Sequence, residues 1–523
     1  MHRWPLILFI TTTVLAQAIM AAAVNAFGEA TGVSSQWVYL ETSGRLGYRT
    51  LTNGDRIMDF SSAGYMGGGV AIPAVPVKVT VSPSGGDDTA TIQEALDQVS
   101  AREPVDGFRG AVLLKPGSYD CKGTLTIRAS GVVLRGSGSE TNGTTLRMGD
   151  SPHLCISCSG SSHIERVGRP ARMLDGYVPS GANSIAVGDA SSFKPGDTIL
   201  LTRPVPASWI RFMGMDTLVR NGKRETWLSA GSSLQTERAI KGVAGNTLTL
   251  DIPLTDSFDA KYLNPPGGLV VKCEVSGRIS QVGVESLRIF APAQVVEITQ
   301  RHHEAIQMNG VSDAWLRDIA IEDTVNSVGL GSSVNRITVE RVSVQHSVAT
   351  KGAAKPADFS VNGAQVLFNR CSSTGNNLFY FVTGARVTGP NVLLNCTFHG
   401  NGHIQPHARW ATGLLVDGCQ VPESGIEFMN RGEMGSGHGW TIGWAVAWNC
   451  VARSYIIQQP PGAVNWAIGC RGRRDESGMP FGHKPNLPEG IFDSHGTPVT
   501  PASLYLAQLR ERLGPQALKN IGY

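Results

Sequence analysis

One short pattern of apolar and polar positions recurs through the second half of the chain. An apolar residue is followed by two residues that are mostly polar or small, then by a second residue of buried type, after which apolar and polar residues alternate. The first copy reads Val284-Glu285-Ser286-Leu287 and the last reads Ala467-Ile468-Gly469-Cys470. The final residues of the eight copies are Leu287, Ile319, Val342, Cys371, Cys396, Cys419, Cys450 and Cys470.

Successive copies end 20 to 32 residues apart. A variable period in this range is typical of a parallel β-helix, in which each coil supplies short strands that bond to the next coil and the turns absorb insertions. The sequence therefore predicts the main β-helix coils over residues 266–474. Five consecutive copies end in cysteine, which predicts an inward-facing stack of thiols acting as small hydrophobic groups, with no chain of disulfides.

The N-terminal part predicts the same architecture. Residues 87–96 have acidic and threonine residues ahead of apolar positions at helical spacing, which predicts a capped helix. Short apolar stretches follow at 111–119, 124–127 and 132–136. This helix covers the open end of the coil, which would otherwise invite edge pairing.

These segments carry a resemblance to a known group of proteins. The sequences Asp87-Asp88-Thr89-Ala90-Thr91-Ile92-Gln93, Leu113-Leu114-Lys115-Pro116-Gly117-Ser118-Tyr119 and Gly131-Val132-Val133-Leu134-Arg135-Gly136 are similar to the opening of the pectate-lyase-like β-helix superfamily. Later phrases around residues 406–413, 430–440 and 448–467 resemble secreted bacterial β-helix proteins of that superfamily. The resemblance implies a right-handed parallel β-helix and a polysaccharide lyase-like activity.

The remaining segments complete the predicted division of the chain. Residues 27–179 form the N-terminal segment and first coils, and residues 180–265, which break the rhythm with short strands around Gly, Pro and Asn turns, form a β-rich insertion. Residues 475–523 form a C-terminal cap and tail with a helix from 503 to 513. The expected fold is thus an all-β right-handed parallel β-helix with an N-terminal capping helix, a β-rich insertion and a C-terminal helix.

The first 26 residues predict a secretory signal peptide. Arg3 precedes an apolar run over residues 6–15, and small residues follow up to Ala26. The run is too short for a comfortable membrane span, and no later stretch of about 18 apolar residues occurs. We therefore expect a secreted or periplasmic protein with no membrane contact after signal removal.

Composition narrows the function classes. Charged residues make up 17% of the chain and the net charge is +3, so no bulk field attracts nucleic acid, and no nucleic-acid motif is present. The 62 glycines in 523 residues indicate many turns. Cys155 and Cys158 form a single Cys-x-x-Cys without a second pair at zinc spacing, which favours a local disulfide or two free thiols over a metal site.

Candidate chemistry lies near residue 407. Residues at equal offsets from the repeat lie on neighbouring coils about 4.8 Å apart, so functional groups gather in a stripe. His407 follows Cys396 by 11 residues, and Asn430 follows Cys419 by the same number. Arg409, Arg431 and His438 stand close by in the sequence.

These residue types suit β-elimination on an acidic polysaccharide that contains uronic acids. A base must remove a proton next to a carboxylate, and cationic groups stabilise the resulting enolate. We predict His407 as base, Arg409 and Arg431 around the carboxylate, and His438 as acid or second neutralising group. The sequence identifies no definite cofactor, and a divalent cation such as Ca²⁺ is an alternative neutralising group. The predicted substrate-binding residues are Asn430, Trp410, Trp440, Gln458, His399, His403 and Asn376.

Three functions remain open at this point: a polysaccharide lyase, a glycoside hydrolase and a non-catalytic glycan-binding protein. The chain lacks the calcium-binding aspartates of pectate lyases, and Arg169-Pro170-Ala171-Arg172 lacks the spacing of their arginine segment, so pectate is a doubtful substrate. A glycoside hydrolase would use a carboxylate pair. A non-catalytic glycan-binding protein would use only arginines and aromatic residues. The carboxylates considered for the hydrolase are Asp358, Asp417, Glu427 and Glu433, and the insertion residues considered for a sugar-binding wall or for packing are Trp209, Arg211, Phe212, Arg220 and Trp227.

Overall fold

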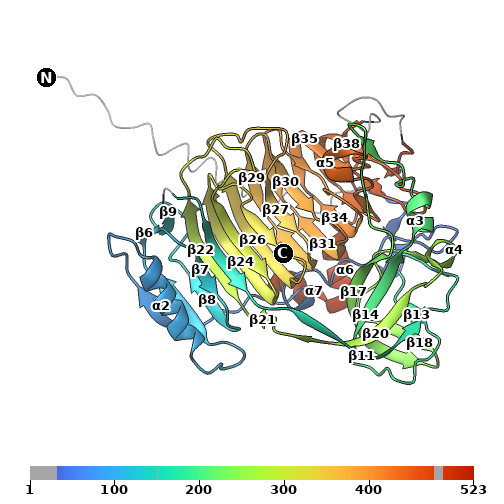
Figure 1. Cartoon of the computed structure of the whole chain (residues 1–523), viewed down its shortest axis with the longest axis horizontal. Helices are drawn as coiled ribbons and strands as arrows, with labels where there is room; N and C mark the ends of the chain where they lie inside the picture. Colours follow the sequence, from blue (N-terminus) through green and yellow to red (C-terminus); the bar gives the residue numbers. More distant parts are fainter. Residues whose placement is uncertain (1–31, 150, 476–486) are drawn as a thin grey trace.

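The computed structural model describes residues 32–149, 151–475 and 487–523. It confirms the predicted parallel β-helix: three ladders of parallel strands run side by side along one long solenoid (Figure 1). The predicted signal peptide lies outside the described residues. Membership of the pectate-lyase-like superfamily stays a prediction.

Each ladder is built from one short strand per coil. The first ladder contains β4 (Val77–Val81), β5 (Gly110–Leu114), β8 (Val132–Arg135), β22 (Gly283–Phe290), β24 (Val311–Glu322), β26 (Asn335–Gln345), β28 (Ala364–Asn369), β31 (Thr388–Leu394), β34 (Ala411–Asp417), β37 (Val446–Trp448), β39 (Trp466–Ile468) and β41 (Ile491–Asp493). β21 (Ile279–Ser280) and β36 (Ile442–Gly443) add short pairings at its edge.

The second and third ladders complete each coil, and some long strands bend at a corner to serve two ladders. The second ladder contains β6 (Gly117–Cys121), β9 (Thr144–Met148), the later parts of β22, β24 and β26, β29 (Ser372–Thr374), β32 (Thr397–His399), β35 (Gln420–Phe428), β38 (Val451–Ile457) and β40 (Arg471–Arg474). The third contains β7 (Leu125–Ile127), β10 (Leu154–Ser159), β23 (Glu304–Asn309), β25 (Val328–Leu330), β27 (Ala357–Val361), β30 (Phe379–Thr383), β33 (His403–Ile404) and the later parts of β35, β38 and β40.

The repeat residues stack in one buried column inside the solenoid. Leu287 pairs with Ile319 and Ile319 with Val342, and the five cysteines continue the column at 0–1% exposure. All nine cysteines are free thiols, including Cys155 and Cys158 on β10, so the predicted thiol stack is confirmed and no local disulfide forms. Each of the five column thiols bonds a backbone carbonyl; Cys450 Sγ, for example, lies 3.2 Å from the Val416 oxygen of the preceding coil.

The two polar or small positions of the repeat form the corner between the first and second ladders. The residue just before each column residue has left-handed φ, as in Asp318 (56°), Arg341 (49°) and Asn395 (51°). Asn, Asp and Gly tolerate this conformation best, which is why such residues recur there. One left-handed residue turns the chain sharply enough to start the next ladder, so the repeat encodes a corner.

The N-terminal end of the solenoid is closed by the predicted helix, α2 (Thr89–Ser100) (Figure 1). Its buried face consists of Ile92, Ala95, Leu96 and Val99, which join the interior cluster of the first coils. Apolar residues at spacings of three and four place these side chains on one side of the helix.

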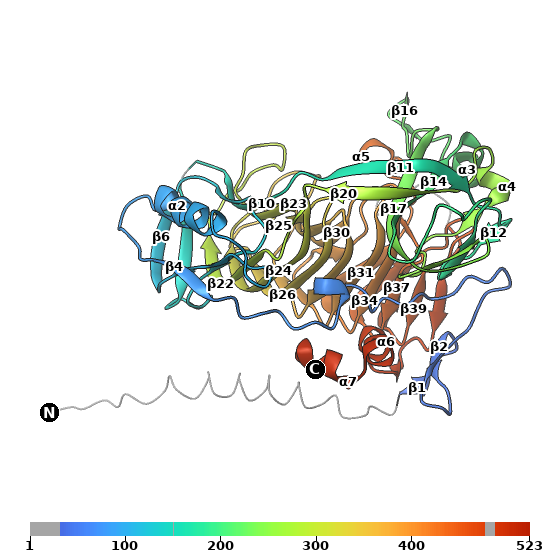
Figure 2. The same cartoon turned by 90° about the horizontal axis from the view of Figure 1, so that it is seen from below.

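The C-terminal helices lie on the side of the solenoid, which differs from the predicted cap on its end. α6 (Leu504–Leu513) and α7 (Pro515–Asn520) run below the first ladder, next to the N-terminal segment (Figure 2). Asp417 on β34 accepts hydrogen bonds from Ser503 Oγ at 2.7 Å and from the Tyr505 backbone N–H at 2.8 Å. The helix is held there because a buried carboxylate satisfies its otherwise free N-terminal donors.

The N-terminal segment runs back along the same side. It begins with β1 (Val33–Ser34), which pairs with β42 (Val499–Thr500), and a hairpin of β2 (Val38–Leu40) and β3 (Leu46–Tyr48), then passes η1 (Tyr65–Gly67) before entering β4 (Figure 2). Tyr505 donates its hydroxyl proton to the Ala63 oxygen at 2.7 Å. This segment and α6 therefore cover the outside of the first ladder together.

The insertion is larger than the predicted interval of 180–265. It leaves the solenoid after β10 through the long antiparallel pair β11 (His163–Arg172) and β20 (Leu269–Ser276), so its sheet spans residues 163–276. Its other elements are β12 (Tyr177–Val178), β13 (Ser184–Ala186), β14 (Thr198–Val205), α3 (Ala207–Phe212), β15 (Val219–Arg220), β16 (Lys223–Arg224), β17 (Ser232–Ala244), β18 (Thr247–Leu250), β19 (Phe258–Asp259) and α4 (Ala260–Leu263).

The pair β11–β20 carries the insertion along the solenoid to the C-terminal coils (Figure 2). There Trp209 and Trp227 pack edge-on against Trp410, with ring centroids 5.6 and 6.1 Å away. Trp227 Nε1 also donates to the Trp440 oxygen at 3.0 Å. Aromatic burial of this kind fixes the insertion against coils that lie some 200 residues later in the chain.

Candidate functional site

A cavity of about 850 Å³ opens over the third ladder near the C-terminal coils. Its walls come from the hairpin β15–β16, from the segments before β23 and β27, from the start of β30, and from the turns after β33 and β35. Three of the four predicted catalytic residues line it: His407, Arg431 and His438. Segments distant in sequence meet here because the coils stack and the insertion reaches across them.

His407 and Arg431, which both line the cavity, are in direct contact. Arg431 Nη1 lies 2.9 Å from His407 Nδ1 and donates to the His407 carbonyl oxygen at 3.0 Å. The His407 ring stands edge-on to Phe379, with ring centroids 5.2 Å apart. Because a guanidinium can only donate, this contact requires an unprotonated imidazole nitrogen.

His438 lies beside His407, with ring centroids 4.7 Å apart. Its Nδ1 atom is buried and has no hydrogen-bond partner among the described residues. Gly435 (φ 64°) lets the loop pass close beneath the ring, since a Cβ there would lie 2.1 Å from His438 Nε2. Unlike His407, His438 therefore has a ring nitrogen that forms no hydrogen bond with the described residues.

Arg409 does not line the cavity but holds the loop that carries His438. Its Nη2 donates to the backbone oxygen and the hydroxyl of Ser436 at 2.7 and 2.6 Å. Arg409 and Trp410 both have left-handed φ, 54° and 66°, a conformation that costs non-glycine residues energy and is often found at functional sites. Both His407 and Arg409 lie outside the solenoid interior, and both contact the loop that carries Ser436 and His438.

Glu427 is a buried carboxylate that interacts with Arg431 of the cavity. Glu427, 8% exposed, pairs with His403 Nδ1 at 2.9 Å and accepts a hydrogen bond from Gln405 Nε2. Burial would raise the pKa of Glu427, but the hydrogen bonds and charges of His403, Gln405 and Arg431 hold it below its usual range. His403, predicted to bind substrate, is therefore engaged with Glu427.

The electrostatic environment of His407 and His438 is strongly cationic. Burial lowers the pKa of His407 to about 2, helped by the charges of Arg431 and His438. Burial and the charges of Arg431, Arg409 and Arg220 lower the pKa of His438 to about 4. Burial also lowers the pKa of Arg431 to about 10. At neutral pH both imidazoles are therefore uncharged while the guanidinium keeps its charge.

Sequence reasoning missed several of the residues that line the cavity, among them one cation and one aromatic residue. Lys355 stands in the segment before β27, and Phe379 begins β30; neither carries a motif or a shared offset that would have marked it. Arg220, considered in the sequence as part of a sugar-binding wall, also lines the cavity, and its guanidinium donates to the Gly435 oxygen. The insertion thus contributes directly to the site.

The predicted tryptophans do not face the cavity. Trp410 is 2% exposed and donates to Asp256 at 2.8 Å, while Trp440 is 3% exposed and donates to the Met213 oxygen at 3.1 Å. Their burial against the insertion is incompatible with substrate binding in this structure. Trp209 and Trp227 are buried in the same interface, so packing explains these insertion aromatics.

The remaining predicted residues are also placed elsewhere. Asn430 and Gln458 are buried, and the Gln458 side-chain oxygen accepts from the Asn430 backbone N–H at 2.7 Å. His399 is exposed and faces Glu423 at 3.4 Å, and Asn376 accepts from the Asn401 backbone N–H at 3.1 Å. None of these four lines the cavity. Equal offset alone therefore did not identify the ligand-facing side chains.

Of the carboxylates considered for hydrolysis, two are buried in structural networks. Asp358 is fully buried and accepts from His346, Ser327 and Ser373, and Asp417 is fully buried under α6. Of these four carboxylates, only Glu433 lines the cavity. Because hydrolysis needs one carboxyl group protonated, the lowered pKa of Glu427 makes it a poor acid.

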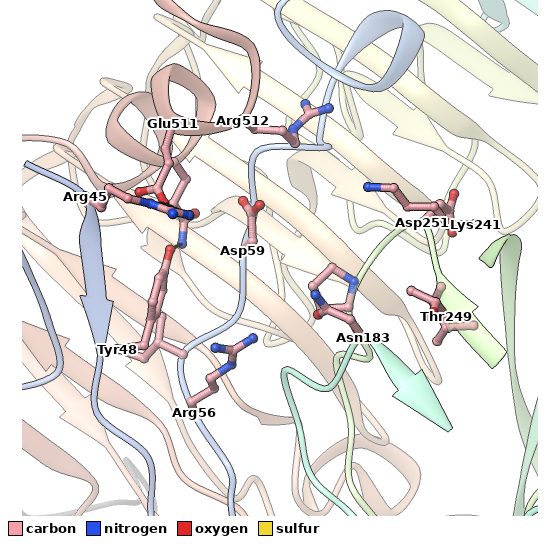
Figure 3. A pocket seen from close by; sticks show the side chains of 14 residues that line it. Arg45, Tyr48, Arg56, Asp59, Asn183, Lys241, Thr249, Asp251, Glu511 and Arg512 are labelled. Atoms are coloured by element: carbon pink, nitrogen blue, oxygen red, sulfur yellow. Dashed lines mark hydrogen bonds and ion pairs between the residues drawn. The ribbon is translucent and has the colours of Figure 1, made fainter. Parts of the chain in front are cut away.

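A second cavity, of about 440 Å³, lies between the hairpin β2–β3, the insertion and α6 (Figure 3). In this cavity Arg45 faces Glu511 at 3.4 Å, and Arg512 donates to Ser61. None of the predicted site residues lines this cavity. We therefore place the candidate site in the larger cavity.

Among the described residues, no group of three or more His, Cys, Asp or Glu side chains is arranged to hold a metal ion. No helix in that part of the chain is long and apolar enough to cross a membrane. The positive charges that the cavity contains belong to Arg and Lys side chains.

Comparison with known proteins gives weak structural similarities. No protein-family model matches the sequence, and no curated protein matches it. A mutant tailspike protein of E. coli bacteriophage HK620 in complex with a pentasaccharide is 10% identical, with a TM-score of 0.40 over 88% of this chain and 65% of that one.

Two other solved structures are similar at the same level. The gp54 tailspike of Acinetobacter baumannii bacteriophage AP22, in complex with a capsular saccharide, is 10% identical, with a TM-score of 0.28 over 78% of this chain and 71% of that one. PfbA, a surface adhesin of Streptococcus pneumoniae, is 9% identical, with a TM-score of 0.29 over 78% and 82%. At these values, function has to be argued from the geometry of the cavity.

Proposed function

We propose that this protein is a secreted enzyme that binds an acidic polysaccharide in the 850 Å³ cavity and cleaves it by β-elimination. One observation carries the proposal: two uncharged imidazoles and the cations Arg220, Lys355 and Arg431 line the same cavity. Cationic groups fixed around a ring carboxylate stabilise the charge that develops when the neighbouring C–H bond is broken.

We assign the base to His438 in place of His407. Arg431 occupies the ring nitrogens of His407, whereas Nδ1 of His438 has no partner among the described residues. A bound carboxylate would offset the positive charges that lower the pKa of His438 and so raise it toward neutrality, where a base is most effective. His407 then orients Arg431.

In the proposed reaction His438 removes the proton at C5 of the uronate. The C5–H electron pair forms the C4–C5 double bond while the C4–O bond to the next sugar breaks. Arg431 and Arg220 neutralise the carboxylate, and we assign Lys355 as the proton donor to the departing oxygen. The product carries an unsaturated uronate at its new non-reducing end.

A panel of uronic-acid polysaccharides tests the proposal. We expect the ultraviolet absorbance of unsaturated uronate to appear with at least one polymer, and His438→Ala to abolish it. The exposed His163→Ala on β11 is the matched control and should retain full activity. New reducing ends without that absorbance would indicate hydrolysis, and binding without cleavage would indicate a non-catalytic protein; either result would overturn the lyase assignment.

A further inference from the structure

Apolar side chains share the cavity with the cationic groups. They come from the insertion, from two loops of the solenoid and from the turn before His438. Those that line the cavity are Val219, Ile298, Ala353, Ala354, Phe379 and Met434. Val219 is 55% exposed, and Ala353 and Ala354 are exposed as well. The protein itself therefore leaves part of this apolar surface uncovered.

This grouping is unusual for a site that binds only carboxylates and hydroxyls. Single exposed apolar residues are common on protein surfaces, but those that converge in one concave site from separate segments usually contact a ligand. A uronate chain without substituents offers few apolar groups to cover them. The surface thus indicates a ligand that carries apolar groups in addition to its charge.

The apolar and cationic side chains alternate along the chain. Val219 is followed by Arg220, and Ala354 is followed by Lys355, so each pair supplies one apolar and one charged group to the same wall. Asn221 at the tip of the β15–β16 hairpin also lines the cavity and offers an amide that can donate to a carbonyl oxygen. Charge, methyl contact and carbonyl recognition therefore lie within adjacent residues.

We propose that the cavity selects an acidic polysaccharide whose sugars carry acyl groups, such as acetyl esters. The carboxylate contacts Arg431 and Arg220, the acyl methyl group contacts Val219 and its apolar neighbours, and the acyl carbonyl accepts from Asn221. This inference rests on the proposed binding of an acidic glycan, but it does not depend on the lyase chemistry.

The test compares O-acetylated polymannuronate and O-acetylated polygalacturonate, each before and after removal of the esters with mild alkali. Binding is measured by affinity electrophoresis, and kcat/KM by the absorbance of unsaturated ends. We expect at least one polymer to be bound about 10-fold more tightly in its acetylated form, the scale on which a pocket discriminates one small apolar group.

Two variants locate the preference. Val219→Thr keeps the shape of the side chain but replaces a methyl with a hydroxyl group, and should reduce the ratio of acetylated to deacetylated binding toward one. Val167→Thr, on β11 and also exposed, is the control and should leave the ratio as in the wild type. An unchanged ratio in Val219→Thr would overturn the proposal.

The outcomes separate this inference from the proposed function. Cleavage of both forms with equal kcat/KM and equal binding would refute acyl recognition while leaving the lyase intact. Preferential binding of the acetylated form without any cleavage would support acyl recognition and refute the lyase. Failure to bind either form of both polymers would refute acyl recognition.

Discussion

The inside and the outside of the same coils are built in opposite ways. Inside, the repeat places a buried apolar residue or cysteine at the same phase, so Cys371, Cys396 and Cys419 continue a single buried column. Outside, over the third ladder, neighbouring coils contribute different residues, His407 and Arg431, in direct contact. The interior column is buried and without charge along its length, whereas the exterior site is local.

The physical reason for the difference is the neighbourhood of each column. An inward side chain meets only the coils before and after it, so similar small residues pack equally well on every coil. An outward side chain meets whatever the loops and the insertion bring to it. The Arg220 guanidinium, for example, reaches the Gly435 oxygen from 215 residues away. Stacking sets where groups lie, and long-range packing sets which of them form a site.

Placing a charge in the interior column should have the largest effect. Cys419 is fully buried among backbone carbonyls and apolar side chains, so Cys419→Asp would bury an unpaired carboxylate. We expect a loss of more than about 4 kcal/mol in the free energy of unfolding, measured by denaturant titration, or no folded protein. Cys419→Ala, which removes only a small volume, should cost about 1 kcal/mol. Equal losses in the two variants would show that the column tolerates charge.

Removing Arg431, the central cation of the exterior site, should leave the fold intact and reduce activity. Arg431→Ala deletes a preorganised electrostatic contact, for which we expect a decrease in kcat of about 100- to 1,000-fold on the cleaved polymer. Circular dichroism and the thermal transition report on the fold. A variant that retains more than a tenth of wild-type kcat would exclude Arg431 from the reaction.

Acid should destabilise the exterior site through its histidines. The pKa of His407 is lowered to about 2 in the folded protein from a normal value of 6.5, so the unfolded chain binds more protons as the pH falls below 6.5. Stability is therefore present at neutral pH and is lost progressively toward pH 2. Between pH 6.5 and 4 we expect His407 to contribute about 1–3 kcal/mol of that loss.

The corresponding measurement is the difference in unfolding free energy between pH 6.5 and pH 4 for His407→Gln and wild type. The variant should show a smaller difference, and His163→Gln, at an exposed site, should behave like wild type. The same slope in all three proteins would contradict a buried, uncharged His407.

The smallest effect is expected where one contact duplicates another. Arg409 Nη2 donates to both the hydroxyl and the backbone oxygen of Ser436, so Ser436→Ala leaves the second bond in place. We expect a decrease in kcat/KM of less than about 5-fold, equivalent to less than about 1 kcal/mol. Arg409→Ala removes both bonds and should have a clearly larger effect; equal effects would show that Arg409 does not position the loop.

Much of the fold could be predicted because its signals are local. The final residue of each repeat copy marks the interior column. The residue before it marks a corner with left-handed φ, as Asn395 and Asp318 show. The helix over α2 was predicted from apolar spacing within twelve residues. The C-terminal helix was predicted by the same signal, but not its place, because that depends on Asp417 in a distant coil.

The candidate site was predictable only in part. His407 was identified through the offset that it shares with Asn430 on the next coil, and Arg431 and His438 through their proximity to Asn430 in the sequence. Trp410 and Trp440 have the residue type of a sugar-binding surface, yet the insertion covers them. Lys355 and Phe379 carry no motif and join the cavity through loop placement alone.

The sequence by itself determined the solenoid, its thiol column and its corners, since each depends on residues within one coil or on the coils before and after it. Only the tertiary structure decided which outward side chains meet a ligand, because the insertion crosses the solenoid and buries some of them while adding Arg220 to others. Contacts between residues some 200 positions apart leave no periodic trace in the chain, and the contact of Arg220 with Gly435 in this site is one of them.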